Sequence, residues 1–322
     1  MNLLKDFLKP KIATKLTGWF LLITLVPLAV VVILANDRGK EQLKHEIMDK
    51  LVVMTVERVS NIENYIRETQ RVLELFVMQP SAIQALEILG KTAQLNGLRS
   101  LEYGVAEGQI RSDFSRFQAI TGFQDISLIS LDGEVIFSLN RKQELGTNYK
   151  TGPLRDSAAA KVFDLASTLL ATEVSEFEFL RGMNEPEVFM ATPFLKSGKM
   201  TGIAMVRLNP REIYALASDY RGLGETGETV IGSKIGNQVV FVAPTRHDPF
   251  AVFKRKINIE LDPDAPLVQA VQGKNDDQQN RAGGKGLIQR LAAHGQLVKV
   301  QGQGPAGRQH VAEKAVRQVG DQ

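Results

Sequence analysis

The stretch FQDISLISLDGEVIFSLN, residues 123–140, contains two runs rich in β-forming residues, joined by Asp132-Gly133. An Asp-Gly pair between two alternating apolar runs is a strong signal for a β-hairpin, because glycine adopts the positive φ that a tight turn needs. We therefore expect a hairpin here. The segments that follow decide what kind of sheet this hairpin opens.

A predicted helix and three more predicted strands follow the hairpin. The helix covers residues 153–171, PLRDSAAAKVFDLASTLLA. The strands cover 173–180, 187–195 and 200–208, and Ser197-Gly198 marks the turn between the last two. Two strands, a helical crossover and three antiparallel strands are the order of a PAS-like sensor sheet. The fold class is therefore predicted to be α+β, rather than a series of βαβ repeats.

The same plan starts again after residue 208. Residues 209–220 are predicted to form a short helix, with Asn209 as its N-cap and Pro210 at its first position. The glycine-rich stretch GLGETGETVIG (222–232) follows, and residues 228–243 are predicted to form a second strand–turn–strand. We interpret the glycine-rich stretch as the connection where one module ends and the next begins.

The N-terminus contains the longest apolar run of the chain. Residues 16–35 carry no charge, and about 20 apolar residues are what a helix needs to cross a bilayer. A cleaved signal peptide is the alternative, but its apolar core is usually shorter, about 7–15 residues, and ILANDRG is a poor cleavage site. The lysines before the run outnumber the basic residues after it by one, which favours a cytoplasmic N-terminus.

A long helix is predicted after the span. Apolar residues recur at threes and fours over 37–79, no glycine or proline interrupts them between Lys40 and Gln79, and Pro80 ends the helix. Such a helix can lie along its own domain, pair with a second copy, or do both. Residues 81–120 are also predicted to be helical, with breaks near three glycines, Gly90, Gly97 and Gly104.

Composition and motifs argue against several classes of function. The net charge is only +3, so global charge gives little support to nucleic-acid binding, and the absence of cysteine excludes thiolate metal sites. Gly222, Gly224 and Gly227 fit G-x-G-x-x-G, but a helix precedes them and a strand follows, which is the reverse of a dinucleotide-binding turn. RHDP (246–249) is interpreted as a turn. We expect no catalytic residues, no metal and no cofactor.

Several stretches together resemble the double Cache sensor region of bacterial transmembrane receptors, especially sensor histidine kinases. The resemblance covers about residues 11–273. It is carried by KIATKLTGWFLLITLVPLAVVVILA, ISLISLDGEVIFS, LGTNYKTGPLRDSAAAKVF, EVFMATPFLKSGKMTGIAMVRLN, GLGETGETVIG and VVFVAPTRHDPFAVFKRKI. The resemblance implies two PAS-like modules outside the membrane, a long helix along both, and a small-molecule site in the distal module. A second span, a HAMP linker and an output domain would follow.

The expected domain organisation follows from these predictions. It comprises a cytoplasmic N-terminus (1–15), a transmembrane helix (16–35), a long helix and helical segment (36–120), a membrane-distal PAS-like module (121–208), a partial membrane-proximal module (209–273) and a tail (274–322). The tail holds no aromatic residue and lacks sustained periodicity, so we expect no strand from it. We interpret it as a frame-shifted or truncated end of a longer receptor gene; a natural disordered tail is the alternative.

The expected ligand site lies between the sheet of the first module and its crossover segment, as the resemblance implies. Its candidate residues are Tyr149, Arg155, Phe179, Arg181, Phe189 and Ala191. Arg155 could clamp a carboxylate, because a guanidinium offers a fork of donors. The alternative is that Arg155 forms a salt bridge and the phenylalanines are core. The Tyr…Arg-x-Trp-Tyr pattern of the amino-acid-binding subgroup is not found, so amino acids are not favoured.

We therefore expect a non-enzymatic sensor segment, single-pass in the plasma membrane, with its sensor region periplasmic or extracellular. Its expected partners are a small-molecule ligand, such as a carboxylate, the membrane and a second copy through the long helix, and not nucleic acid. One alternative is a structural or decoy membrane protein that dimerises through this helix. Another is a sensor fragment of chemoreceptor or cyclase type.

Overall fold

The computed structural model describes residues 12–140, 145–179, 185–272 and 296–301. The chain divides into two compact units, Met1–Val53 and Met54–Gln322. The helix α1 (Ile12–Met78) contains Pro27 and extends from the first unit into the second. It is the one helix in the described part of the chain that is long and apolar enough to cross a membrane, judged by length and composition. Its apolar side chains from Leu16 to Leu34 are exposed.

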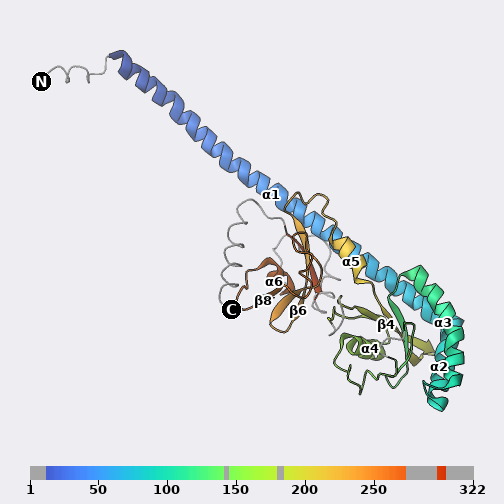
Figure 1. The fold of residues 1–322 in the computed structure, drawn as a ribbon. Helices are drawn as coiled ribbons and strands as arrows, with labels where there is room; N and C mark the ends of the chain where they lie inside the picture. The colour runs from blue at the N-terminus through green and yellow to red at the C-terminus, as the bar shows by residue number, and fades with distance from the viewer. Residues whose placement is uncertain (1–11, 141–144, 180–184, 273–295, 302–322) are drawn as a thin grey trace. The chain divides into compact units, whose positions relative to one another are not determined.

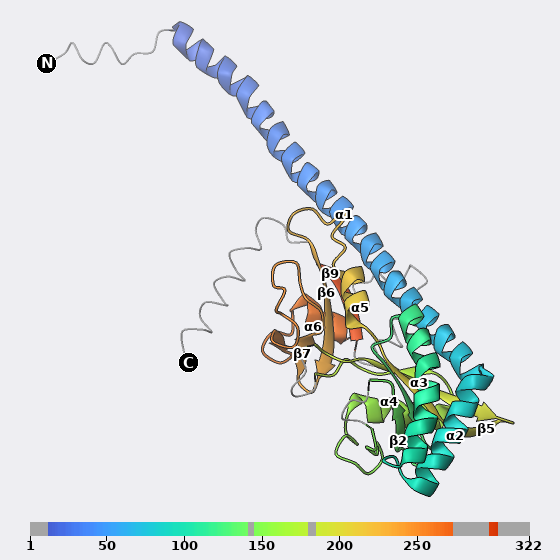
Figure 2. The same ribbon diagram turned by 45° about the vertical axis from the view of Figure 1, so that its right-hand side comes forward.

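The helices α2 (Pro80–Asn96) and α3 (Leu101–Thr121) follow α1 and lie side by side (Figures 1 and 2). The predicted end of the long helix before Pro80 is confirmed. The predicted breaks near Gly90 and Gly104 are wrong, because both glycines lie inside helices. The chain breaks at Gly97, whose φ is 85°, and Ser100 then caps α3 by accepting from Tyr103 N. A helix interior tolerates an isolated glycine when the flanking residues favour helix.

The first sheet has the strand order β2-β1-β5-β4-β3. Its elements are β1 (Asp125–Ile129), β2 (Val135–Ser138), the crossover helix α4 (Ala158–Leu169), β3 (Glu173–Val174), β4 (Phe189–Lys196) and β5 (Lys199–Arg207). The predicted succession along the chain, two strands, a helical crossover and three further strands, is confirmed. Both predicted turns are confirmed: Gly133 has φ 85°, and Ser197 and Gly198 have φ 49° and 74°. All neighbouring strands of this sheet pair antiparallel.

The strand predicted over 173–180 is only partly formed. β3 ends at Val174, and an isolated bridge between Glu178 and Glu187 continues the edge. Between them, the Ser175 hydroxyl accepts a hydrogen bond from Phe189 N at 2.8 Å. Because a serine side chain accepts this hydrogen bond in place of a backbone carbonyl, the regular ladder of backbone hydrogen bonds between the two strands is interrupted.

The two faces of the first sheet pack against different partners. One face contacts the long helices, through a core that includes Phe76, Phe114 and Phe137. The other face contacts α4, whose buried side chains include Val162 and Phe163. Since both faces are covered, the strands are buried along most of their length, as β1 and β2 are throughout.

The second sheet has the order β8-β7-β6-β9. Its elements are α5 (Pro210–Ala217), β6 (Glu228–Ile235), β7 (Gln238–Phe241), β8 (Lys256–Asn258), α6 (Pro266–Val271) and β9 (Gln296–Gln301). The predicted N-cap of α5 is confirmed, because Asn209 Oδ1 accepts from Arg211 N at 3.1 Å. The sheet packs on α6 through a separate small core that includes Val239, Leu267 and Val268.

The prediction that no strand forms after residue 273 is wrong for residues 296–301. β9 pairs antiparallel with β6, with Gln301 opposite Glu228 and Gln296 opposite Ser233. Its sequence, QLVKVQ, places Leu297, Val298 and Val300 among polar residues. Valine fits a pleated strand well, and this short run is obscured when composition is averaged over the glutamine- and glycine-rich tail. The rest of the predicted tail lies outside the described residues.

The glycine-rich stretch 222–232 forms the turn that leads into β6, as predicted. Gly222 and Gly224 have positive φ values of 80° and 67°, and β6 begins at Glu228. Arg246 donates through Nη1 to the carbonyl oxygens of Gly224 (2.6 Å) and Gly227 (3.1 Å). Its guanidinium also lies 4.9 Å from the centre of the Tyr220 ring. Arg246 of the RHDP segment therefore holds this turn through the turn's own backbone.

Candidate functional site

The face of the first sheet that α4 covers carries three of the residues predicted to line a ligand site. Tyr149, Phe189 and Ala191 are buried together in the core cluster beneath α4. The Tyr149 ring lies 6.3 Å from the Phe163 ring of α4. Lys150 Nζ lies 5.7 Å from the centre of the same Phe163 ring. These residues form the apolar end of the α4-facing surface of the sheet.

The other three predicted residues are not part of this cluster. The Arg155 side chain is 65% exposed, and its Nε lies 3.5 Å from Asp156 Oδ2. Phe179 is 43% exposed, and its ring lies 5.5 Å from the ring of Phe253. Arg181 lies outside the described residues. Arg155 therefore stands at the solvent-facing side of the loop before α4.

A buried polar group at the other end of the same surface was missed by the sequence analysis. Asp125 accepts hydrogen bonds from Ile126 N (2.9 Å), Asn140 N (3.0 Å) and Ser138 Oγ (2.8 Å). Side chains alternate along a strand, so Asp125 shares the face of Ile129, which packs under α4. Arg207 is opposite Asp125 in the β1–β5 register.

Arg207 forms the centre of this polar end. It is 2% exposed, and its Nε lies 3.2 Å from Oε1 of the buried Glu187. Its guanidinium also lies 5.6 Å from the centre of the Phe189 ring. The polar end therefore adjoins the apolar end directly, because Arg207 of the polar end contacts Phe189 of the apolar end.

Glu178 connects the polar end to α4. Its Oε2 accepts a hydrogen bond from Ala158 N at 2.8 Å, at the first residue of the helix. Burial raises the pKa of the Glu178 carboxyl, and the charge of Glu187 raises it further, whereas the hydrogen bond from Ala158 N and the charge of Lys161 lower it. We call the four residues Asp125, Glu178, Glu187 and Arg207 the polar cluster.

One signal for the polar cluster was present in the sequence. In DISLIS (125–130), Asp125 and Ser127 alternate with Ile126 and Leu128. Such alternation usually marks a strand with one face in water. Here the polar face lies beneath α4, so the polar residues are buried and must find hydrogen-bond partners in the protein or in a ligand.

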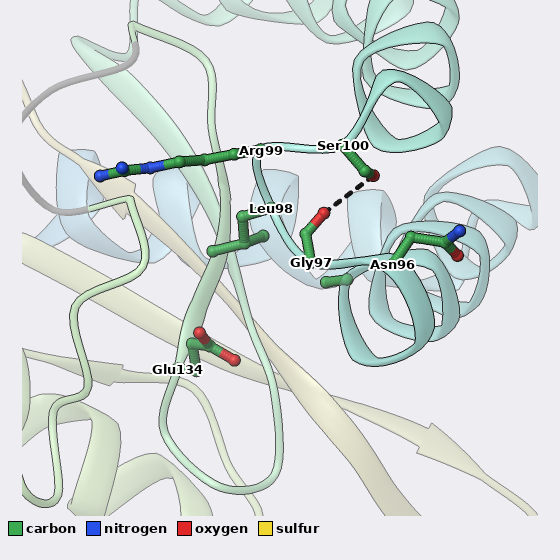
Figure 3. Close-up of a pocket in the computed structure, with 7 residues that line it drawn as sticks. Asn96, Gly97, Leu98, Arg99, Ser100 and Glu134 are labelled. Carbon is green, nitrogen blue, oxygen red and sulfur yellow. Dashed lines mark hydrogen bonds between the residues drawn. The ribbon is translucent and has the colours of Figure 1, made fainter.

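Two hollows lie near the first sheet. A small cleft of about 80 Å³ runs between α4 and the sheet edge, and Lys161, Leu165 and Ser175 are among its lining residues. A wider and open groove of about 580 Å³ lies between the α2–α3 turn and Glu134 (Figure 3). In that groove Ser100 Oγ donates to Gly97 O at 2.9 Å, which holds the turn closed. The cleft, unlike the groove, adjoins the surface that carries the polar cluster, since Ser175 binds Phe189 N.

No family model matches the chain, and no curated protein matches it. Several solved structures that are similar to it are sensor or ligand-binding domains. The sensor domain of the V. cholerae histidine kinase DctB is 15% identical, with 68% of this chain and 76% of that chain covered and a TM-score of 0.45. The ligand-binding domain of the Pseudomonas aeruginosa chemoreceptor PctC, in complex with GABA, is 16% identical, with 62% and 75% covered and a TM-score of 0.40. That of the Campylobacter jejuni chemoreceptor Tlp3, in complex with L-valine, is 12% identical, with 74% and 83% covered and a TM-score of 0.46.

Proposed function

We propose that this chain is a membrane-anchored, extracytoplasmic small-molecule sensor segment of a histidine-kinase-type receptor. The observation that carries the proposal is the α4-facing surface of the first sheet. That surface combines a buried aromatic end, with Tyr149 and Phe189, and a buried charged end, with Glu187 and Arg207. Ligand sites are typically apolar surfaces with a few placed polar groups, and this is the arrangement found here.

The anchor in this proposal is the apolar part of α1. Residues 16–35 carry no charge and their described side chains are exposed. Exposed apolar side chains over about 20 helical residues are expected of a helix whose solvent is lipid. The sensor modules would then lie on the side of the membrane opposite the N-terminus, in the periplasm or outside the cell.

The proposed ligand lies between α4 and the sheet, against Tyr149, Phe189 and Ala191. We propose that Arg155 acts at the entrance, where its exposed guanidinium would meet the carboxylate of an anionic ligand. Phe179 and Arg181 are proposed to contribute further contacts to the ligand. The mechanism is a population shift: a ligand that contacts both α4 and the sheet favours the arrangement in which these contacts are made. A ligand with equal affinity for both arrangements would transmit nothing.

The test is a thermal-shift screen of the full chain in nanodiscs against a metabolite library. We expect at least one compound to raise the melting temperature. The variant Arg155→Ala should abolish the response to carboxylates, and it should leave the melting temperature without ligand unchanged, because the side chain is exposed. An unchanged carboxylate response would show that Arg155 is not part of the site. A folded, dimeric protein that no compound stabilises would contradict the sensor proposal and favour a structural role.

A further inference from the structure

Two glutamates of the polar cluster stand directly opposite each other. Glu178 N donates to Glu187 O at 2.9 Å, and Glu187 N donates to Glu178 O at 2.7 Å. Residues that exchange both hydrogen bonds are a cross-strand pair whose side chains project from the same face. Like charges in such a pair repel each other. A buried pair of this kind needs positive charge or donors nearby.

The protein places a positive group or a hydrogen-bond donor against one oxygen of each of the two carboxylates. Glu187 Oε1 faces Arg207 Nε at 3.2 Å, and Glu178 Oε2 accepts from Ala158 N. The remaining oxygen of Glu187, Oε2, is buried and accepts no hydrogen bond from the described part of the chain. Glu187 as a whole is only 4% exposed. A buried carboxylate oxygen without a donor is unfavourable, so this oxygen is where a donor from outside the chain gains most.

The charge of the cluster defines what kind of donor fits. Asp125, Glu178 and Glu187 are acidic, and Arg207 is the single base among the four cluster residues. Asp125 already accepts three hydrogen bonds. Lys161 acts on Glu178 through its charge. An anion would meet three carboxyl groups here, whereas a cation would offset the repulsion between Glu178 and Glu187.

We propose that the α4-facing surface binds the cationic hydrogen-bond donor of its ligand, a primary ammonium or a guanidinium, at Glu187 Oε2. The proposal rests on the proposed sensor function and adds the chemical class of one ligand group. It also assigns ligand groups of opposite charge to the entrance and to the interior of the site. Arg155 at the entrance suits an anionic group, and Glu187 in the interior suits a cationic one.

The probes are two matched sets that differ in charge: n-butylguanidine with its neutral isostere n-butylurea, and 1,4-diaminobutane with 1,4-butanediol and succinate. Binding to the full chain in nanodiscs is measured by thermal shift and calorimetry. We expect at least one cationic probe to bind at least 10-fold more tightly than its neutral isostere. Neutral probes that bind as well as the cations, or an absence of binding by both cations, would overturn the proposal.

The variant Glu187→Gln removes the charge and keeps the size of the side chain. We expect at least 10-fold weaker binding of the cationic probe, while the control Glu102→Gln, on the exposed surface of α3, binds as the wild type does. If Glu187→Gln fails to fold, Glu178→Gln takes its place, because it leaves Glu187 intact and removes its like-charged neighbour. With Glu178→Gln we expect weaker cation binding, and unchanged binding would contradict the proposal.

The outcomes also separate this inference from the sensor function on which it rests. If succinate or other library anions bind and the cations do not, the sensor proposal stands and the cationic site is wrong. If no compound of any charge binds a folded protein, both fail.

Discussion

Arg58 on α1 donates a hydrogen bond from Nη1 to Asp219 Oδ2 at 2.6 Å and so ties the helix to the segment between α5 and β6. The Arg58 side chain is 8% exposed. Arg221 adds two hydrogen bonds to Asp219, from Nε to Oδ1 (3.0 Å) and from Nη2 to Oδ2 (2.8 Å). These hydrogen bonds, first those from Arg221 and then that from Arg58, hold the pKa of the Asp219 carboxyl well below its usual value. The same segment approaches α1 again at Gly222, where an added Cβ would clash with Met54 Cε.

We expect Asp219→Asn to destabilise the protein at pH 7 by about 1–3 kcal/mol, because hydrogen bonds to a charged group are lost and Arg58 stays buried. An acid whose pKa is lowered by folding stabilises the fold above its unfolded pKa, and this contribution is lost as the pH falls through the folded pKa. The difference in stability between the wild type and the variant should therefore shrink below pH 3.8. Denaturant unfolding at pH 7 and pH 3 measures it; an equal difference at both would contradict the ionic role.

Gly202 in β5 tests the packing of the first sheet against α2. A Cβ at this position would lie 2.8 Å from Ile129 O and 2.9 Å from both Leu86 Cδ atoms. We expect Gly202→Ala to destabilise the fold by about 1–3 kcal/mol, since a well-packed core resists an added carbon. Gly104→Ala is the control, because Gly104 is inside α3 with nothing within 4 Å and alanine favours helix. The control should be neutral or stabilising in thermal unfolding.

The two hairpins of the first sheet were predictable because their turns carry local signals. Gly133, Ser197 and Gly198 have positive φ values, and the two turns fix two pairs of neighbouring strands, β1 with β2 and β4 with β5. The breaks predicted in the helices at Gly90 and Gly104 failed for the converse reason. Glycine permits a break but does not require one, and the residues around both glycines favour helix.

The charged end of the candidate site could not be predicted from local signals. Arg207 and Glu187 are 20 residues apart in the sequence, and the sequence does not say that α4 covers them. Glu187 is the first residue of the strand predicted over 187–195, and Arg207 lies near the end of the strand predicted over 200–208. Neither position indicates a buried charge. Arg155 had the residue type expected of a ligand clamp, but its side chain faces solvent. Whether a charged residue is buried depends on tertiary packing, so no repeating pattern in the sequence indicates it.

Glu178 gives a prediction with the opposite pH dependence to that of Asp219. Burial raises the pKa of this carboxyl above its ordinary value of 4.5, and Glu187 adds to the effect. An acid with a raised folded pKa is unfavourable to the fold once ionised, so its penalty appears as the pH rises through the folded pKa. Glu178→Gln, whose amide oxygen can still accept from Ala158 N, should be more stable than the wild type at pH 7. The gain should vanish below pH 4.5 in thermal unfolding; a gain that persists there would contradict this origin.

The outer surface of α1 tests the proposed homodimer. Val53 and Val56 are 66% and 43% exposed, while Thr55 and Arg58 on the opposite side are buried. The chain has no cysteine, so a single introduced thiol reports on one contact. We expect Val56→Cys to form disulfide-linked dimers in membranes on mild oxidation, and Glu102→Cys on exposed α3 to remain monomeric. Equal crosslinking of both variants would indicate random collision rather than a helix pair.

Asp125 and Ser138 test whether the polar cluster supports the fold as well as a ligand. Asp125 Oδ1 accepts from Ile126 N and Asn140 N, and Oδ2 accepts from Ser138 Oγ. Asp125→Ala leaves all three donors without this acceptor, so we expect a loss of about 3 kcal/mol or more, whereas Ser138→Ala should lose about 1 kcal/mol. The double variant should lose less than the sum, by about 0.5–3 kcal/mol, because the two residues share a hydrogen bond. Strict additivity in denaturant unfolding would show that this hydrogen bond contributes nothing, and Asp125 would then hold the β1–β2 hairpin through its backbone contacts alone.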